Sequence, residues 1–119
     1  MRFVLILCCF LGIAPTVQSD PAVIKNVEAT NDGPTWTFAV TLQHPDTGWD
    51  HYANGWRVLS MAGEVLGTRV LAHPHVDEQP FTRLLSGVEL PAGTTQVQIQ
   101  SSCVVDGWSN APLIMTLEN

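Results

Sequence analysis

The segment LAHPHVDEQPF, from Leu71 to Phe81, holds two histidines on either side of a proline, followed by two carboxylates. Side chains two positions apart in an extended segment project to the same side, so His73 and His75 can act as a pair. Pro74 fixes its own φ angle and favours an extended conformation at His73, which lowers the entropy cost of ordering the pair. This spacing predicts one half of a metal site.

A second pair of histidines supplies the other half of the predicted site. Neutral imidazoles are good ligands for zinc and copper(II), and we expect one such ion to be bound. The predicted ligands are His44, His51, His73 and His75. Nearby carboxylates are candidates to bind the ion or to hold the second ring nitrogen of a ligand histidine. These carboxylates are Asp50, Asp77 and Glu78.

Other metals fit the sequence less well. Met61 and Met115 fall in separate segments, so copper(I) lacks a cluster of soft ligands. Magnesium and calcium prefer oxygen ligands to histidines. Cys103 shares the face of a predicted strand with Val97 and Ile99, which indicates a small core residue. No histidine follows Cys103 within the next few residues, so the sequence argues against a blue-copper site.

Motifs typical of hydrolytic enzymes are missing from the sequence. It contains neither GxSxG nor HExxH, and no cysteine is expected beside the histidines. We therefore expect a binding protein and not an enzyme.

Short segments with a period of two predict the elements that position these residues. In Thr35–Leu42 the apolar side chains alternate with threonines, and turn-forming residues separate this segment from its neighbours. The sequence predicts an all-β, seven-stranded antiparallel sandwich with an immunoglobulin-like or fibronectin-III-like course. A small open barrel is the main alternative. The predicted strands are Ala22–Ala29, Thr35–Leu42, Gly55–Met61, Glu64–Ala72, Phe81–Leu90, Gln96–Cys103 and Leu113–Leu117.

This strand course brings three loops to the same end of the predicted sandwich. Successive antiparallel strands alternate in direction, so every second connection returns to one end. The three loops are Gln43–Ala53, His73–Pro80 and Val104–Pro112. They contain all four histidines, which is why we expect the two pairs to meet.

The N-terminus has the features of a secretory signal peptide. Met1 and Arg2 precede an apolar run, and small and polar residues lead to an expected cleavage site after Ser19. We therefore expect a signal peptide at 1–19, a single domain at 20–119, and a periplasmic or secreted protein without a membrane anchor.

The charge of the chain limits its partners. Its formal net charge is -6, and the predicted cleavage removes Arg2 but no acidic residue. Such an acidic domain offers no basic surface for nucleic acid. We expect a metal ion as ligand, with a periplasmic protein as a further candidate partner.

Two of the tryptophans suggest an alternative function. Trp36 and Trp56 fall in strand patterns and are expected in the core, whereas Trp49 and Trp108 lie in loops at the end of the sandwich where the histidines are expected. The loop tryptophans suit a module that binds a protein, peptide or glycan without a metal.

Three segments carry a resemblance to known sequences: TGWDHYA, GWRV and LGTRVLAHPHVDEQPFTR. Together they resemble a family of small secreted proteobacterial proteins without an assigned function. The resemblance implies a periplasmic location and supplies no activity or catalytic residue.

Overall fold

The computed structural model describes residues 20–118, which form eight β-strands and no helix. The prediction of an all-β sandwich of two antiparallel sheets is confirmed. In this part of the chain no helix is long and apolar enough to cross a membrane. The predicted signal peptide at 1–19 lies outside the described residues.

Each of the seven predicted strands has a counterpart with slightly different ends. The predicted number is exceeded by one, because the two-residue strand β7 forms inside the segment expected to be a loop. The strands are β1 Val23–Asn31, β2 Trp36–Gln43, β3 Ala53–Leu59, β4 Val65–Val70, β5 Phe81–Val88, β6 Gln96–Cys103, β7 Gly107–Trp108 and β8 Leu113–Thr116.

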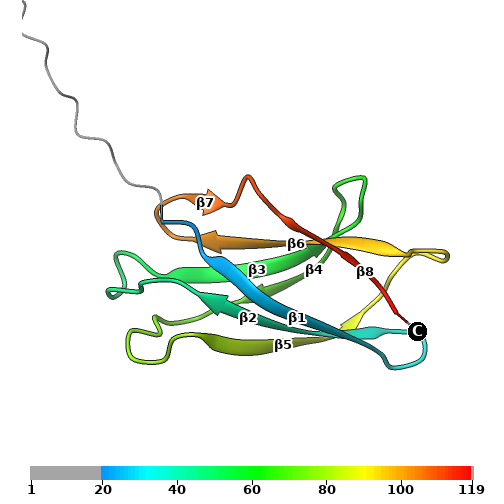
Figure 1. The fold of residues 1–119 in the computed structure, drawn as a ribbon, viewed down its shortest axis with the longest axis horizontal. Coiled ribbons are helices and arrows are strands. Elements are labelled where there is room, and N and C mark those ends of the chain that lie inside the picture. Colours follow the sequence, from blue (N-terminus) through cyan, green and yellow to red (C-terminus); the bar gives the residue numbers. More distant parts are fainter. Residues whose placement is uncertain (1–19, 119) are drawn as a thin grey trace, which may run out of the picture.

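The strands divide into two sheets that face each other (Figure 1). One sheet has the order β1-β2-β5, and the other has the order β4-β3-β6-β7. Strand β8 pairs with the first half of β6, whereas β7 pairs with its last two residues. Since β3 occupies the other side of β6, β7 and β8 share one edge.

Alternation along the strands builds the core between the sheets. Trp36, Phe38, Val40 and Leu42 are buried as predicted, and the threonines between them are not. From the opposite sheet, Trp56 is fully buried among them. Burial of one face of each strand removes apolar surface from water and fixes the register of the strands.

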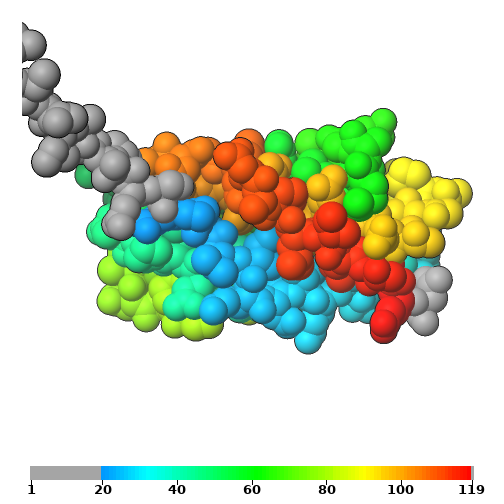
Figure 2. All heavy atoms as spheres, turned by 45° about the horizontal axis from the view of Figure 1, so that its top comes forward, coloured from blue at the N-terminus to red at the C-terminus, as the bar shows by residue number. Residues whose placement is uncertain are grey.

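The first and last strands lie beside each other on one side of the sandwich. Residues 21–24 and 111–113 line the same shallow groove, and Figure 2 shows the red C-terminal segment against the blue N-terminal one. The hydroxyl of Ser101 in β6 donates to the carbonyl oxygen of Ala22 at 2.6 Å, across the two sheets. This contact ties the start of β1 to the strand that ends in Cys103.

Three loops meet at one end of the sandwich, as the sequence predicts. The β2–β3, β4–β5 and β6–β7 connections all lie at the left in Figure 1. All four histidines of the chain belong to the first two of these loops. The tertiary structure decides which of them come together.

Candidate metal centre

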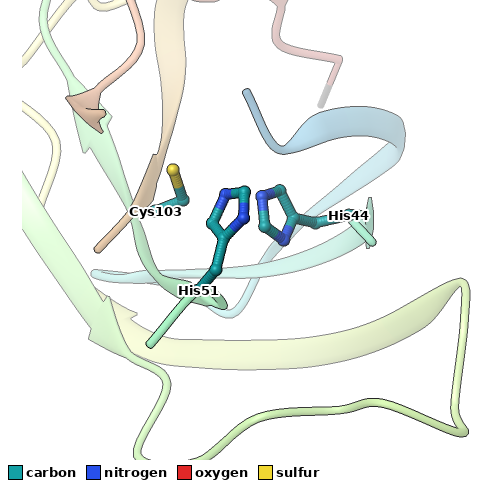
Figure 3. A group of neighbouring side chains, drawn as sticks. All are labelled: His44, His51 and Cys103. Atoms are coloured by element: carbon teal, nitrogen blue, oxygen red, sulfur yellow. The ribbon is translucent and has the colours of Figure 1, made fainter. Parts of the chain in front are cut away.

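His44, His51 and Cys103 form a compact group at this end of the sandwich (Figure 3). One ligating atom of each residue lies within 4.8 Å of the other two. The rings of His44 and His51 meet edge to face, with their centroids 4.7 Å apart. Among residues 20–118, this is the group of three potential metal ligands that the fold brings together.

Backbone pairing positions each of the three residues. His44 directly follows β2, and Cys103 is the last residue of β6. Cys103 pairs with Ala53, the first residue of β3, so His51 enters the neighbouring strand beside the cysteine. The turn before β3 is closed because the backbone N–H of Thr47 donates to the carbonyl oxygen of His51 at 3.0 Å.

The buried carboxylate of Asp46 fixes the orientation of the His44 ring. Its Oδ1 lies 2.5 Å from Nδ1 of His44, and it also accepts the backbone N–H of Ala53 at 3.0 Å. Because the carboxylate accepts, Nδ1 carries the proton and the lone pair of the neutral ring lies on Nε2. A carboxylate in this position is the usual support for a metal-ligating histidine.

The free nitrogens of this group are buried and have no hydrogen-bond partner. Nε2 of His44 and Nε2 of His51 are both in this condition, although buried polar atoms in proteins are nearly always paired. His44 is 1% exposed, whereas His51 is partly exposed. A metal ion between the rings would satisfy both nitrogens.

Cys103 is buried, as the sequence predicts, but its thiol faces more than apolar side chains. Its Sγ lies 3.5 Å from Oδ2 of Asp106 and accepts the backbone N–H of Asp106 at 3.4 Å. The expectation that no cysteine lies beside the histidines is wrong. The sequence argument against a blue-copper site considered only histidines that follow the cysteine, whereas both neighbouring histidines precede it by fifty residues or more.

The second histidine pair lies in the β4–β5 loop, at the same end of the sandwich but outside this group. The rings of His73 and His75 are 4.6 Å apart, and the ring of His75 stacks on Phe81 with centroids 4.1 Å apart. Nε2 of His75 accepts a hydrogen bond from the Arg83 guanidinium at 2.9 Å. His73 is exposed and contacts the carbonyl oxygen of Pro74. Each ring thus has a local role that does not require a metal.

Burial holds the pKa of His75 below its ordinary value, and the positive charge of Arg83 and the neighbouring His73 lower it further. The backbone of the same residue fastens the loop, since its N–H donates to Oδ2 of Asp46 at 2.8 Å. The side chain of Gln79 adds two hydrogen bonds: its Oε1 accepts from the backbone N–H of His44, and its Nε2 donates to the carbonyl oxygen of His75. His75 therefore joins the β4–β5 loop to the end of β2.

The carboxylates predicted to support the ligands lie at the surface. Asp50, Asp77 and Glu78 are exposed, and Glu78 forms an ion pair with Arg83 at 3.3 Å. The carboxylate that does hold a histidine is Asp46. Its position two residues after His44 is the sequence signal that could have identified it.

The tryptophans divide as predicted. Trp36 and Trp56 are buried in the core, whereas Trp49 is 68% exposed and contacts Tyr52 edge to face. Trp108 lies on the outer face of its sheet, where the guanidinium of Arg57 covers its ring.

Comparisons with known proteins support the fold more than the chemistry. No family model matches the chain. A protein of Halomicrobium mukohataei named "Putative lipoprotein" is 39% identical over 82 residues, which are 69% of this chain and 40% of that protein. The chain thus spans about two fifths of this relative, whose name states no activity.

The fold is similar to that of a solved structure. This is the crystal structure of a hypothetical protein from Pyrococcus horikoshii, with a TM-score of 0.57 and 13% sequence identity. The similarity covers 82% of this chain and 90% of that one. At this level of identity the likeness concerns the arrangement of the strands alone.

The environment of His75 predicts a pH-dependent stability. Because its pKa is lower in the folded than in the unfolded chain, unfolding takes up a proton as the pH falls. The contribution of His75 to the free energy of unfolding is present above its pKa in the unfolded chain, about 6.5. It is lost as the pH falls through the pKa of His75 in the folded protein. Urea unfolding of metal-free protein at pH 7.5, 6.5 and 5.5 should show wild type losing stability relative to His75→Gln. A stability difference that is the same at all three pH values would contradict this role.

Proposed function

We propose that this protein binds one metal ion, zinc or copper, through His44, His51 and Cys103. The observation that carries the proposal is the convergence of three ligating atoms within 4.8 Å, two of them on histidine rings with buried and unpartnered Nε2 atoms. Imidazole nitrogen and thiolate sulfur are ligands that both metals accept.

The geometry of the group is close to what an ion requires. Metal bonds of about 2.0 Å to nitrogen and 2.3 Å to sulfur place ligand atoms roughly 3.5 Å apart in a tetrahedral site. The ligating atoms, which now lie within 4.8 Å of one another, would therefore need to move by only about an ångström each to bind an ion. Asp46 favours this closure, because it already holds the His44 ring with Nε2 turned away from it.

The proposed ligand set keeps half of the one predicted from the sequence. His44 and His51 remain, and Cys103 takes the place of His73 and His75. Nε2 of His75 accepts a hydrogen bond from the partly buried guanidinium of Arg83. A metal ion bound to this nitrogen would break that hydrogen bond. The role proposed for His75 is to fasten the β4–β5 loop to Asp46, whereas His73 is exposed and makes no such contact.

We also propose that the protein is exported and acts in the cell envelope or periplasm. The support is the signal-like composition of residues 1–19 and the relative named as a lipoprotein. The strand order, with β1, β2 and β5 facing β4, β3, β6 and β7, supports an immunoglobulin-like or fibronectin-III-like course. The proposed role is binding and not catalysis, since His44 and Cys103 are each 1% exposed.

The proposed ligand set can be tested by measuring metal affinity in variants that each lack one ligand. Titration of the purified apoprotein with zinc or cobalt(II) should give one ion bound per chain. Cobalt(II) bound to wild type should show a thiolate-to-metal charge-transfer band. His44→Gln, His51→Gln and Cys103→Ser should each weaken binding by at least about 100-fold, because each removes one of only three ligands.

The matched control is His73→Gln, which alters an exposed histidine in the same end of the fold. It should leave the affinity unchanged, and urea unfolding without metal should show that the other variants are folded. If His73→Gln/His75→Gln abolished binding while Cys103→Ser retained it, the ligand set proposed from the structure would be wrong.

Asp46 provides a separate prediction about support of the site. In Asp46→Asn one acceptor oxygen becomes an NH₂ group, which must then face the proton of His44 Nδ1 or the N–H of His75. We expect metal affinity to fall about 10- to 100-fold and the fold to lose about 1–3 kcal/mol. Calorimetry and urea unfolding measure the two effects. Asp50→Asn, in the same loop but exposed, should change neither; an equal effect at both positions would show that general charge and not this contact matters.

A second candidate function is recognition of a partner without a metal. The observation that favours it is Trp49, whose ring is 68% exposed, next to the exposed Val104 and Val105. Tyr52 connects them, because its ring meets that of Trp49 and its carbonyl oxygen accepts the N–H of Val104. Exposed apolar groups gathered in this way are typical of binding surfaces.

This alternative predicts that the purified domain captures a specific exported protein from the source cells. The capture should persist when a chelator is added and should be lost with the variant Trp49→Ala. Val70→Ala, which alters an equally exposed residue on β4, should have no effect. Capture that disappears with the chelator would instead link the partner to the metal.

A further inference from the structure

We infer that the bound ion is copper and that the His44–His51–Cys103 site exchanges single electrons. This inference rests on the proposed metal site and adds its redox role. It follows from the number of ligands, the surroundings of the sulfur and the unequal exposure of the two histidines.

Three ligands suit copper better than structural zinc. Structural zinc sites in proteins have four protein ligands, whereas trigonal sites of two histidines and one cysteine are typical of electron-transfer copper. Within residues 20–118, no fourth histidine, cysteine or carboxylate joins the group. Asp106 comes near, but its carboxylate contacts the thiol without completing the set.

Two contacts of the sulfur bear on its conversion to a thiolate, one with the carboxylate and one with the backbone N–H of Asp106. Metal binding requires loss of the thiol proton, and the carboxylate of Asp106, which is exposed to solvent, lies beside it to take the proton. The backbone N–H of Asp106 then remains as a hydrogen-bond donor to Sγ. Hydrogen bonds to the cysteine sulfur tune the potential of such copper sites.

Of the methionines in residues 20–118, neither is placed to act as a fourth, weak ligand. Met61 follows β3 at the far end of the sandwich, and Met115 pairs with Val97 at the start of β6. Cys103 closes the opposite end of that strand. The proposed copper is thus held by nitrogen and thiolate, without a thioether.

His51 is the route by which an electron reaches the site. His44 and Cys103 are buried, but His51 is partly exposed and its loop also carries the exposed Trp49. One electron from a one-electron donor converts copper(II) to copper(I), and the reverse step returns it to a one-electron acceptor. No protein bond forms or breaks in either direction. Strand pairing holds Cys103 and Asp46 holds the His44 ring, so these two ligands need to move little between the two states.

The experiment loads the purified full chain with one equivalent of copper(II) and follows visible absorption and electron paramagnetic resonance. We expect an intense thiolate-to-copper(II) band. Ascorbate should bleach it with uptake of one electron per copper, and ferricyanide should restore it over repeated cycles. Cys103→Ser and His44→Gln should lose the band, while His73→Gln should retain it. Urea unfolding of the metal-free variants shows whether a variant that lacks the band is still folded.

Two results would overturn the inference in distinguishable ways. If copper(II) oxidised Cys103 to an intermolecular disulfide, or gave no thiolate band while zinc still bound to the three ligands, the electron-transfer role would be wrong and the metal site would stand. If neither zinc nor copper bound the wild-type protein, the inference and the proposed function would fail together.

Discussion

The histidine-bearing end of this protein depends on the hydrogen bonds of the Asp46 carboxylate. Asp46 is 5% exposed and accepts hydrogen bonds from three segments: the His44 ring after β2, the N–H of Ala53 that begins β3, and the N–H of His75 in the β4–β5 loop. A buried carboxylate is costly unless its oxygens are hydrogen bonded, so these three donors must stay in place together. One side chain thereby fixes two sheets and a loop relative to each other.

The charge of this carboxylate has a further consequence for the proposed site. Among the described residues, the ionic contact of Asp46 is with the His44 ring and not with an arginine or lysine. An ion bound to Nε2 of His44 would place a positive charge on the far side of that ring, where it offsets the buried negative charge. The contact that supports the fold would in this way also support the proposed metal ion.

The two histidine pairs show how the same residue type takes different roles in neighbouring loops. His75 stacks on Phe81 and accepts from Arg83, so its ring is used as a flat, neutral packing element. His44 and His51 meet edge to face with their free nitrogens unpaired. Nδ1 of His75 is also buried without a partner, so the difference between the pairs lies in the stacking and the Arg83 contact that the tertiary structure supplies to His75.

The sequence alone determined the sheet-forming segments, the inward face of β2, the burial of Cys103 and the gathering of the histidine loops at one end. These features depend on local alternation and on the direction of successive strands, both of which can be read along the chain. It did not reveal the role of Asp46, the separate use of His75, or the meeting of His51 with Cys103. That meeting depends on the pairing of Ala53 with Cys103, fifty residues apart and next to an irregularity in register. Register between distant strands is set by packing of the whole core, so only the tertiary structure decided which nitrogens face the sulfur.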